Sequence, residues 1–252
     1  MKPHGPVVSG PTLEILESRK LLAAATFINP PTVSQTPMSG MVQMQRADFV
    51  YQPEPELDDL VTRGRSRFFI LEPGRRMVYH GQEDGEQVRL VIAVTERTRL
   101  IDGVRTRVVR EVEHVNGELI EVSWNYLAMD EDNGDLFYFG EDVNIYEDGK
   151  LVSHEGAWRS GVDGARFGLL MPGDPQVGMT FLQERAPGVA LDEGRIVNLN
   201  SMVRTPLGRF RNCAKVEETS ALEPGALSIK YHAPGVGLVQ DGVLKLTAIY
   251  ER

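Results

Sequence analysis

The sequence predicts an all-β protein, and two observations carry that prediction. Between Val88 and Lys150, runs of alternating apolar and polar residues are separated by four X-Gly pairs: Asp102-Gly103, Asn116-Gly117, Asn133-Gly134 and Asp148-Gly149. Such pairs favour two-residue hairpin turns, because a type I′ turn needs positive φ at both central residues. In addition, no helical periodicity longer than two turns is evident in the chain. We therefore expect a single antiparallel meander.

The strands are expected in sequence order. Phe68 to Leu71 leads into the turn Glu72-Pro73-Gly74-Arg75, and Arg76 to His80 follows. The hairpins between Val88 and Lys150 come next, and the last of them should set Glu147 opposite Lys150. Later strands are expected at Phe167–Met171, Thr180–Glu184, Arg195–Arg204, Gly208–Glu217, Leu227–Ala233 and Val243–Tyr250.

Alternation within these strands predicts which face is buried. After the row that contains Val88, Leu90, Ile92 and Val94, we expect the inward rows to be formed by Val104, Thr106, Val108 and Val112, and then by Ile120, Val122, Trp124, Tyr126 and Ala128. Arg105, Arg107, Glu111 and Glu113 are expected on the opposite face. A dozen or so strands must hide their edges, so the sheet should curl into a barrel or a two-layer sandwich.

Composition divides the chain in two. Residues 1–64 are expected to form an export and linker segment, because the first 45 or so are rich in Pro, Ser, Thr, Gly and Met and the rest contain an acidic, proline-bearing run. This lead should be mostly disordered, with one helical turn around Leu57 to Thr62. Residues 65–252 are expected to form the antiparallel β domain.

Charge and cysteine content exclude several classes of protein. The chain has 252 residues, of which 27 are basic and 36 acidic, giving a formal charge of -9, so nucleic acid is not an expected partner. Cations, or cationic and neutral ligands, suit the negative electrostatic field of the protein better. No apolar run approaches the roughly 20 residues of a membrane span. The single cysteine, Cys213, allows no intrachain disulfide, and its alternating surroundings predict a buried, inert thiol.

An acidic stretch offers a candidate calcium site. Asp130, Asp132, Asn133 and Asp135 supply oxygen ligands, but an EF-type loop needs Gly at its sixth position, whereas Gly134 falls at the fifth. The alternative is a hairpin tip whose Asp and Asn side chains satisfy local backbone donors. The segment that starts at Asp132 also resembles the structural hairpin turn called an Asp-box.

A second set of carboxylates follows aromatic strands. Glu141 and Asp142 come directly after Phe137-Tyr138-Phe139-Gly140, and Glu184 ends an apolar strand. If Glu141 and Glu184 converge, they either bind a metal or act as acid and base in hydrolysis. The alternative is that each lies at the surface. The candidate metal ligands are therefore Asp130, Asp132, Glu141, Asp142 and Glu184.

The histidines form no zinc motif, since neither an HxH nor an HExxH pattern is present. His232 stands out because the glycines of Lys230-Tyr231-His232-Ala233-Pro234-Gly235-Val236-Gly237 allow the backbone to approach a ligand. There is also no Gly-x-Ser-x-Gly, phosphate loop or dinucleotide fingerprint.

Two resemblances add to these patterns. The segment Leu16-Glu17-Ser18-Arg19-Lys20-Leu21-Leu22 resembles the LEPR-XLL motif of exported planctomycete-type bacterial proteins, with Ser18 in place of Pro, and it implies a secreted, surface or periplasmic location. Segments between Gly103 and Gly242, among them Gly-Ala-Trp-Arg-Ser-Gly at Gly156 and Met-Pro-Gly-Asp-Pro at Met171, resemble a family of uncharacterised exported bacterial β proteins. This second resemblance implies one shared site or core formed by Glu141, Trp158, Glu184, Lys230 and Tyr231.

We expect an exported binding or structural module rather than an enzyme. Its candidate ligand-binding residues are Trp158, Lys230, Tyr231 and His232, and the leading ligand is a divalent cation such as calcium. Two alternatives stay open: an extracellular hydrolase that uses Glu141 and Glu184, and a barrel that carries a lipid or another small apolar ligand.

Overall fold

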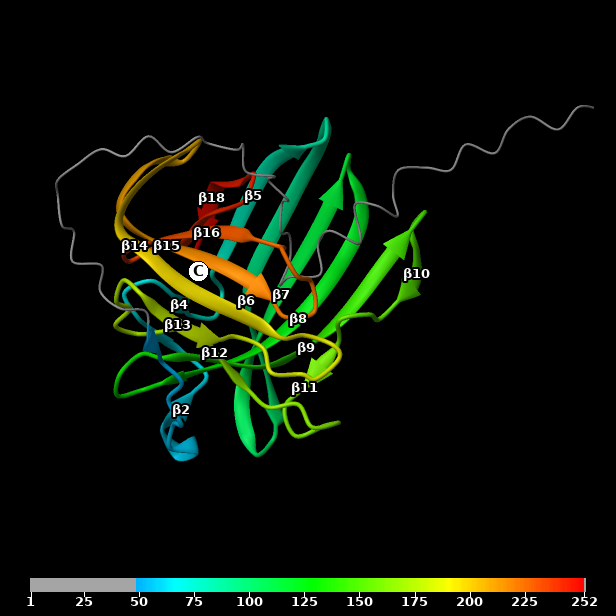
Figure 1. Cartoon of the computed structure of the whole chain (residues 1–252). Helices are drawn as coiled ribbons and strands as arrows, with labels where there is room; N and C mark the ends of the chain where they lie inside the picture. Colours follow the sequence, from blue (N-terminus) through cyan, green and yellow to red (C-terminus); the bar gives the residue numbers. More distant parts are fainter. Residues whose placement is uncertain (1–48, 252) are drawn as a thin grey trace, which may run out of the picture.

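The computed structural model describes residues 49–251, and within them the chain is all-β and mostly antiparallel (Figure 1). The predicted fold class is thereby confirmed. The export motif lies outside the described residues, as does most of the lead predicted to be disordered. No helix in residues 49–251 is long and apolar enough to cross a membrane.

The strands of the first half are short at first and then long. They are β1 (Phe49–Val50), β2 (Leu60–Val61), β3 (Gly64–Arg65), β4 (Ile70–Leu71), β5 (Arg76–Glu83), β6 (Glu86–Ile101), β7 (Val104–Val115), β8 (Glu118–Asp130) and β9 (Leu136–Glu147). A 3-10 turn, η1 (Leu57–Asp59), precedes β2 and falls within the range predicted for a helical turn.

The second half follows the same pattern with more short strands. They are β10 (Lys150–Ser153), β11 (Trp158–Arg159), β12 (Gly168–Met171), β13 (Met179–Leu182), β14 (Asp192–Thr205), β15 (Gly208–Ser220), β16 (Ser228–Ala233), β17 (Gly237–Asp241) and β18 (Leu244–Tyr250). Neither β11 nor β17 was expected from the sequence.

One sheet contains nearly all of these strands. Its order is β1-β13-β14-β15-β16-β17-β18-β5-β6-β7-β8-β9-β10, with β2, β11 and β12 pairing to the side, while β3 and β4 form a separate pair. The parallel β1–β13 pair is the exception to antiparallel pairing among the described strands. No closed barrel is found in this part of the chain, and the strand order ends at β1 and β10.

The turn predictions are confirmed at three of four positions. Asp102, Asn116 and Asp148 have φ of 49°, 51° and 50°, and the glycine after each also has positive φ, as a type I′ turn requires. Glu147 pairs with Lys150, as predicted. The fourth prediction is wrong: β8 ends at Asp130 and β9 begins at Leu136, so Asn133-Gly134 belongs to a longer loop. Asp84-Gly85, which was not predicted, forms a further turn with both φ values positive.

The segment before residue 65, expected to be a linker, is partly built into the sheet. β1 pairs with β13 and β2 pairs with β8. The Tyr51 hydroxyl donates a hydrogen bond of 2.8 Å to Asp135 Oδ2, which ties this segment to the β8–β9 loop. Residues 49–64 therefore pack with the β domain.

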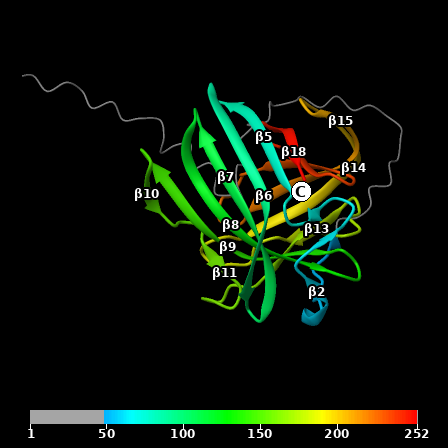
Figure 2. The same ribbon diagram turned by 180° about the vertical axis from the view of Figure 1, so that it is seen from behind.

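The long sheet curls, so that its first half faces its second half. In Figures 1 and 2, β14, β15 and β16 lie across from β6 to β9. Side chains of both halves line one internal cavity of about 70 Å³, including Glu111 from β7 and Lys230 from β16. The curl therefore gives the sheet an inner face.

The prediction of which side chains in the central strands face the interior is partly wrong. Glu111, expected opposite the buried row, lines the internal cavity, and so does Asn125 of β8. In the observed register Glu111 pairs with both Ile92 and Ser123, so the inner face mixes apolar and polar side chains. The opposite row is also buried, because Tyr126 and Val108 pack in the core as well. Because side chains on both faces of these strands are buried, hydrophobicity alone cannot identify the face that lines the cavity.

Cys213 is fully buried in the hydrophobic core, which confirms its predicted location. Burial raises the pKa of its thiol, so the reactive thiolate is disfavoured.

Candidate functional site

A bulge in β9 brings the first two site residues onto one face of the strand. Glu141 pairs with Asn125, but the next pair along is Tyr138 with Leu127, so one extra residue of β9 is accommodated around Gly140. Gly140 has a φ of 119°, and a Cβ there would lie 2.2 Å from the carbonyl oxygen of Trp158. Only glycine fits this position. The bulge turns Tyr138 and Glu141 to the same side, where the Tyr138 hydroxyl donates a hydrogen bond of 2.6 Å to Asn125 Oδ1, the strand partner of Glu141.

Trp158 covers this pair. It enters from β11, which pairs with β9 next to the bulge, and its ring packs edge-on against Tyr138 with centroids 5.3 Å apart. The side chain is 5% exposed, yet the indole Nε1 has no hydrogen-bond partner. A buried indole N–H normally has a partner, so this donor is available to a bound molecule.

Glu184 approaches the same region from the end of β13. It is 2% exposed, and its Oε1 has no hydrogen-bond partner. Burial raises its pKa well above the usual range, and the nearby charges of Glu141 and Asp192 raise it further. Sequence reasoning proposed that Glu141 and Glu184 converge. The charge of Glu141 is the foremost of the neighbouring charges that raise the pKa of Glu184, while the two residues line different clefts.

Further carboxylates line the same interior, and their charges act on one another. Burial raises the pKa of Glu111 to about 7, with a further rise from Glu121, and it raises the pKa of Asp192 to about 7. Burial also raises the pKa of Glu141 well above its usual range, and Glu121 and Glu111 add to this. This group is called the interior acids below: Glu111, Glu121, Glu141, Glu184, Asp192, Glu218 and Asp241.

One buried lysine, Lys230, partly compensates the negative charge of the interior acids. The Lys230 Nζ lies 2.7 Å from Glu218 Oε2 and 4.0 Å from Asp241 Oδ2, and these charges raise the lysine pKa despite its burial. The other buried cations of residues 49–251 are engaged elsewhere: Arg75 with Glu251 and Arg107 with main-chain oxygens. The interior acids therefore outnumber the cation among them.

His232 adds no charge at neutral pH. It is 7% exposed, and burial lowers its pKa to about 4. Its ring lines the 70 Å³ cavity beside Lys230, and its Nδ1 has no hydrogen-bond partner.

Two clefts open beside the interior. Glu141, Trp158 and Ala165 line one of about 260 Å³, and Glu184 and Arg166 line another of about 550 Å³. Pro187 borders both, so the segment around it separates them. Charged side chains line both clefts, and the internal cavity falls below the roughly 300 Å³ of a drug-sized ligand site. The lipid-carrier hypothesis therefore gains no support.

The five predicted metal ligands do not form one centre. Asp130 caps its own loop, where Oδ1 accepts hydrogen bonds from the amides of Asp132 and Asn133 at 2.9 and 3.2 Å. The predicted alternative for this stretch, a hairpin tip that satisfies local donors, is thus confirmed. Within residues 49–251 no group of three or more His, Cys, Asp or Glu residues is arranged to hold a metal ion.

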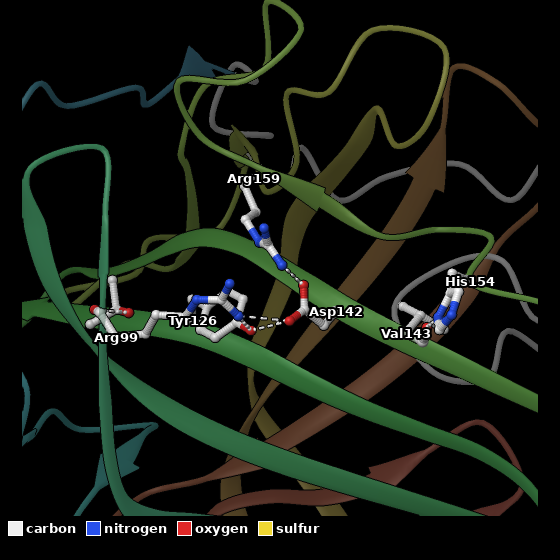
Figure 3. A network of polar contacts seen from close by, with 7 residues as sticks. Arg99, Tyr126, Asp142, Val143, His154 and Arg159 are labelled. Atoms are coloured by element: carbon white, nitrogen blue, oxygen red, sulfur yellow. Dashed lines mark hydrogen bonds and ion pairs between the residues drawn. The ribbon is translucent and has the colours of Figure 1, made fainter.

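Asp142 points to the opposite face of β9 from Glu141, as adjacent strand residues do, although both residues border the 260 Å³ cleft. On its face it forms ion pairs with Arg99, at 2.7 Å, and with Arg159, and it accepts a 2.7 Å hydrogen bond from Tyr126 (Figure 3). Nearby, His154 Nδ1 lies 2.8 Å from the carbonyl oxygen of Val143. The contacts of Asp142 with Tyr126, Arg159 and Arg99 lower its pKa, and the ion pair with Arg159 holds β11 against β9.

Tyr231 does not join the site. It alternates with Lys230 and His232 on β16, which both line the cavity, so it faces the other side and packs against the core. Sequence reasoning missed Glu111, Asp192, Glu218 and Asp241. For Glu111 the available signal was an acid in an otherwise apolar strand, which was interpreted as part of the face opposite the buried row.

No protein-family model, curated protein or solved structure matches this chain. The chemistry of the site therefore has to be inferred from its own residues.

Proposed function

We propose that the protein is a binding module whose interior acids and two adjoining clefts, of about 260 and 550 Å³ on either side of Pro187, take a small, hydroxyl-bearing organic cation of the amino-sugar class. The observation that carries this proposal is the pair of buried polar atoms without partners, Glu184 Oε1 and Trp158 Nε1, beside an excess of carboxylates. Buried polar groups are normally satisfied, and each unsatisfied one costs about 1–3 kcal/mol. A ligand that supplies both partners offsets that cost.

Each part of the ligand follows from a group in the site. An ammonium suits Glu141 and Glu184, because two carboxylates in one buried place cannot both ionise without a cation. A hydroxyl oxygen suits the Trp158 N–H, which needs an acceptor. The indole also borders the 260 Å³ cleft, next to Glu141.

An organic cation fits this site better than the divalent metal predicted from the sequence. A calcium ion takes six to eight oxygen ligands at 2.3–2.6 Å, and no metal-holding cluster occurs within residues 49–251. An ammonium needs fewer acceptors and leaves room for the Trp158 contact. Calcium addition and EDTA should therefore leave the melting temperature unchanged.

Two finer expectations from the sequence belong to this proposal. The first is a two-layer arrangement of the curled sheet, supported by the cavity that both halves line. The second is an exported location, which suits a receptor for an extracellular amine. Cell fractionation with an antibody to the chain tests the location, and recovery in the cytoplasmic fraction alone would remove it.

Glucosamine and glucose form a matched pair of probes, because glucosamine carries one ammonium where glucose carries a hydroxyl. Isothermal titration calorimetry should detect glucosamine binding and much weaker glucose binding. Glu141→Gln and Glu184→Gln should each weaken glucosamine binding at least tenfold, since a charge-assisted hydrogen bond is worth roughly 1.5–3 kcal/mol. Glu118→Gln, an exposed change of the same kind on β8, is the control. Equal affinity for the two sugars would reject the cation.

A carboxylate-pair hydrolase is the second candidate, and the effect of the Glu141 charge on the pKa of Glu184 favours it. Both pKa values are raised, and a general acid needs a raised pKa. The test is release of nitrophenol from a panel of nitrophenyl glycosides at mildly acidic pH. Turnover that disappears in both Glu141→Gln and Glu184→Gln would establish this candidate, and no turnover by the unmodified protein would remove it.

A further inference from the structure

The β14–β15 hairpin carries a charge opposite to that of the whole protein. Residues 195–216 contain five basic residues and no acidic one, in a chain whose formal charge is -9. The hairpin forms the long curved arm at the upper left of Figure 1. A basic arm on an acidic protein concentrates attraction for anions at one place.

The arginines at the end of this arm form no ion pair with the described part of the chain. Arg204, Arg209 and Arg211 are all exposed, and no ion pair with another residue of 49–251 engages them. Their charges therefore remain available to a partner outside the described chain.

The strand register adds an independent observation. Arg204 lies directly opposite Arg209, so two like charges form a cross-strand pair. Like charges in this position destabilise a hairpin, whereas the β9–β10 hairpin sets Glu147 opposite Lys150. An anion between the guanidinium groups would convert the repulsion into attraction. This pairing therefore points to an anionic partner.

Apolar side chains accompany the arginines. Met202 is 57% exposed and shares the Arg204 face of β14 by strand alternation, and Leu207, at the turn, is 44% exposed. A soluble anion would leave both side chains in water. A lipid bilayer offers anionic headgroups to the arginines and an apolar layer to Met202 and Leu207.

We propose that the end of the β14–β15 hairpin, formed by Met202, Arg204, Leu207, Arg209 and Arg211, docks the protein on an anionic lipid bilayer. The arginines bind headgroup phosphates, and the two apolar side chains enter the interface. This peripheral contact does not depend on the proposed ligand of the interior acids.

Co-sedimentation with vesicles tests the docking. The full chain should bind vesicles of equimolar phosphatidylglycerol and phosphatidylcholine and should not bind phosphatidylcholine alone. Each basic residue near such a surface contributes a factor of about five to partitioning, so R204Q/R209Q/R211Q should bind about 100-fold more weakly. R89Q/R97Q/R105Q makes the same charge change at exposed positions of β6 and β7 and should lose far less.

Two readouts separate docking from a folding defect or another partner. The hairpin triple variant should melt no lower than the unmodified protein, because it removes the repulsion between Arg204 and Arg209. M202S/L207S should weaken vesicle binding and leave binding to heparin, a soluble polyanion, unchanged. Equal vesicle binding by the two triple variants would overturn the proposal. A second combination of results would also overturn it: heparin binding as tight as vesicle binding, and vesicle binding by M202S/L207S equal to that of the unmodified protein.

Discussion

Replacing Glu111 with Gln should make the protein more stable at alkaline pH and leave its stability unchanged at acid pH. Burial raises the Glu111 pKa from 4.5 to about 7, so the folded protein holds this proton more tightly than the unfolded chain does. A group of this kind lowers stability as the pH rises from its unfolded pKa to its folded pKa. Gln resembles the protonated acid in shape and cannot ionise.

The magnitude follows from the shift. One pKa unit corresponds to 1.36 kcal/mol, which gives an upper bound of about 3 kcal/mol, and the partial exposure of Glu111 reduces this to about 2 kcal/mol. In a domain of this size, 1 kcal/mol changes the melting temperature by about 2–4 °C. Glu111→Gln should therefore raise the melting temperature by about 4–8 °C at about pH 8 and by nearly zero at about pH 4.

The assay is thermal unfolding by circular dichroism across this pH range, with Glu118→Gln as the exposed control. The control should change the melting temperature by the same small amount at every pH. A gain for Glu111→Gln that is the same at acid and alkaline pH would refute the reasoning, because it would mean that ionisation is not the cause. No gain at alkaline pH would show that Glu111 is solvated.

Three further outcomes follow from contacts in the structure. Lys230→Met should lower the free energy of unfolding, measured by chemical denaturation, by about 3–5 kcal/mol, because it leaves buried carboxylates uncompensated. Adding Glu218→Gln should restore part of this loss, and no recovery would contradict the pairing of Lys230 with Glu218. Gly140→Ala should destabilise more than Gly117→Ala, because both have positive φ but only Gly140 meets main-chain atoms; equal losses would argue against the bulge. Cys213 should react with a thiol reagent only at the rate of unfolding, and fast labelling of the native protein would place the thiol outside the core.

Much of the fold was predictable from local chemistry. Asp102-Gly103 and Asn116-Gly117 set hairpin turns through backbone conformation alone, which sequence neighbours determine. Asn133-Gly134 failed because Asp130 and Asn133 bond the backbone of a longer loop instead. Such competition between side chain and backbone is not visible in the alternation of apolar residues.

The site was only half predictable. Glu141 and Glu184 were identified from their positions after aromatic and apolar strands, and both are buried, with the charge of Glu141 raising the pKa of Glu184. Glu111 was assigned to the wrong face, because apolar neighbours in β7 marked the other row as buried and both rows are covered in the fold. Glu218 joins the site through long-range pairing of β15, which no local pattern encodes.

Proton release on glucosamine binding tests the central claim most directly, namely that buried, largely protonated carboxylates receive an organic cation. Near pH 7, where Glu111 and Asp192 are about half ionised, a bound ammonium should expel protons, and affinity should rise from acid pH to about pH 7, over which range the amine of the ligand stays protonated. Calorimetry in two buffers of different ionisation enthalpy should therefore give different binding heats, and the difference should shrink in Glu141→Gln/Glu184→Gln. Binding near pH 7 with no proton release, or affinity that does not rise between about pH 5 and about pH 7, would contradict the account.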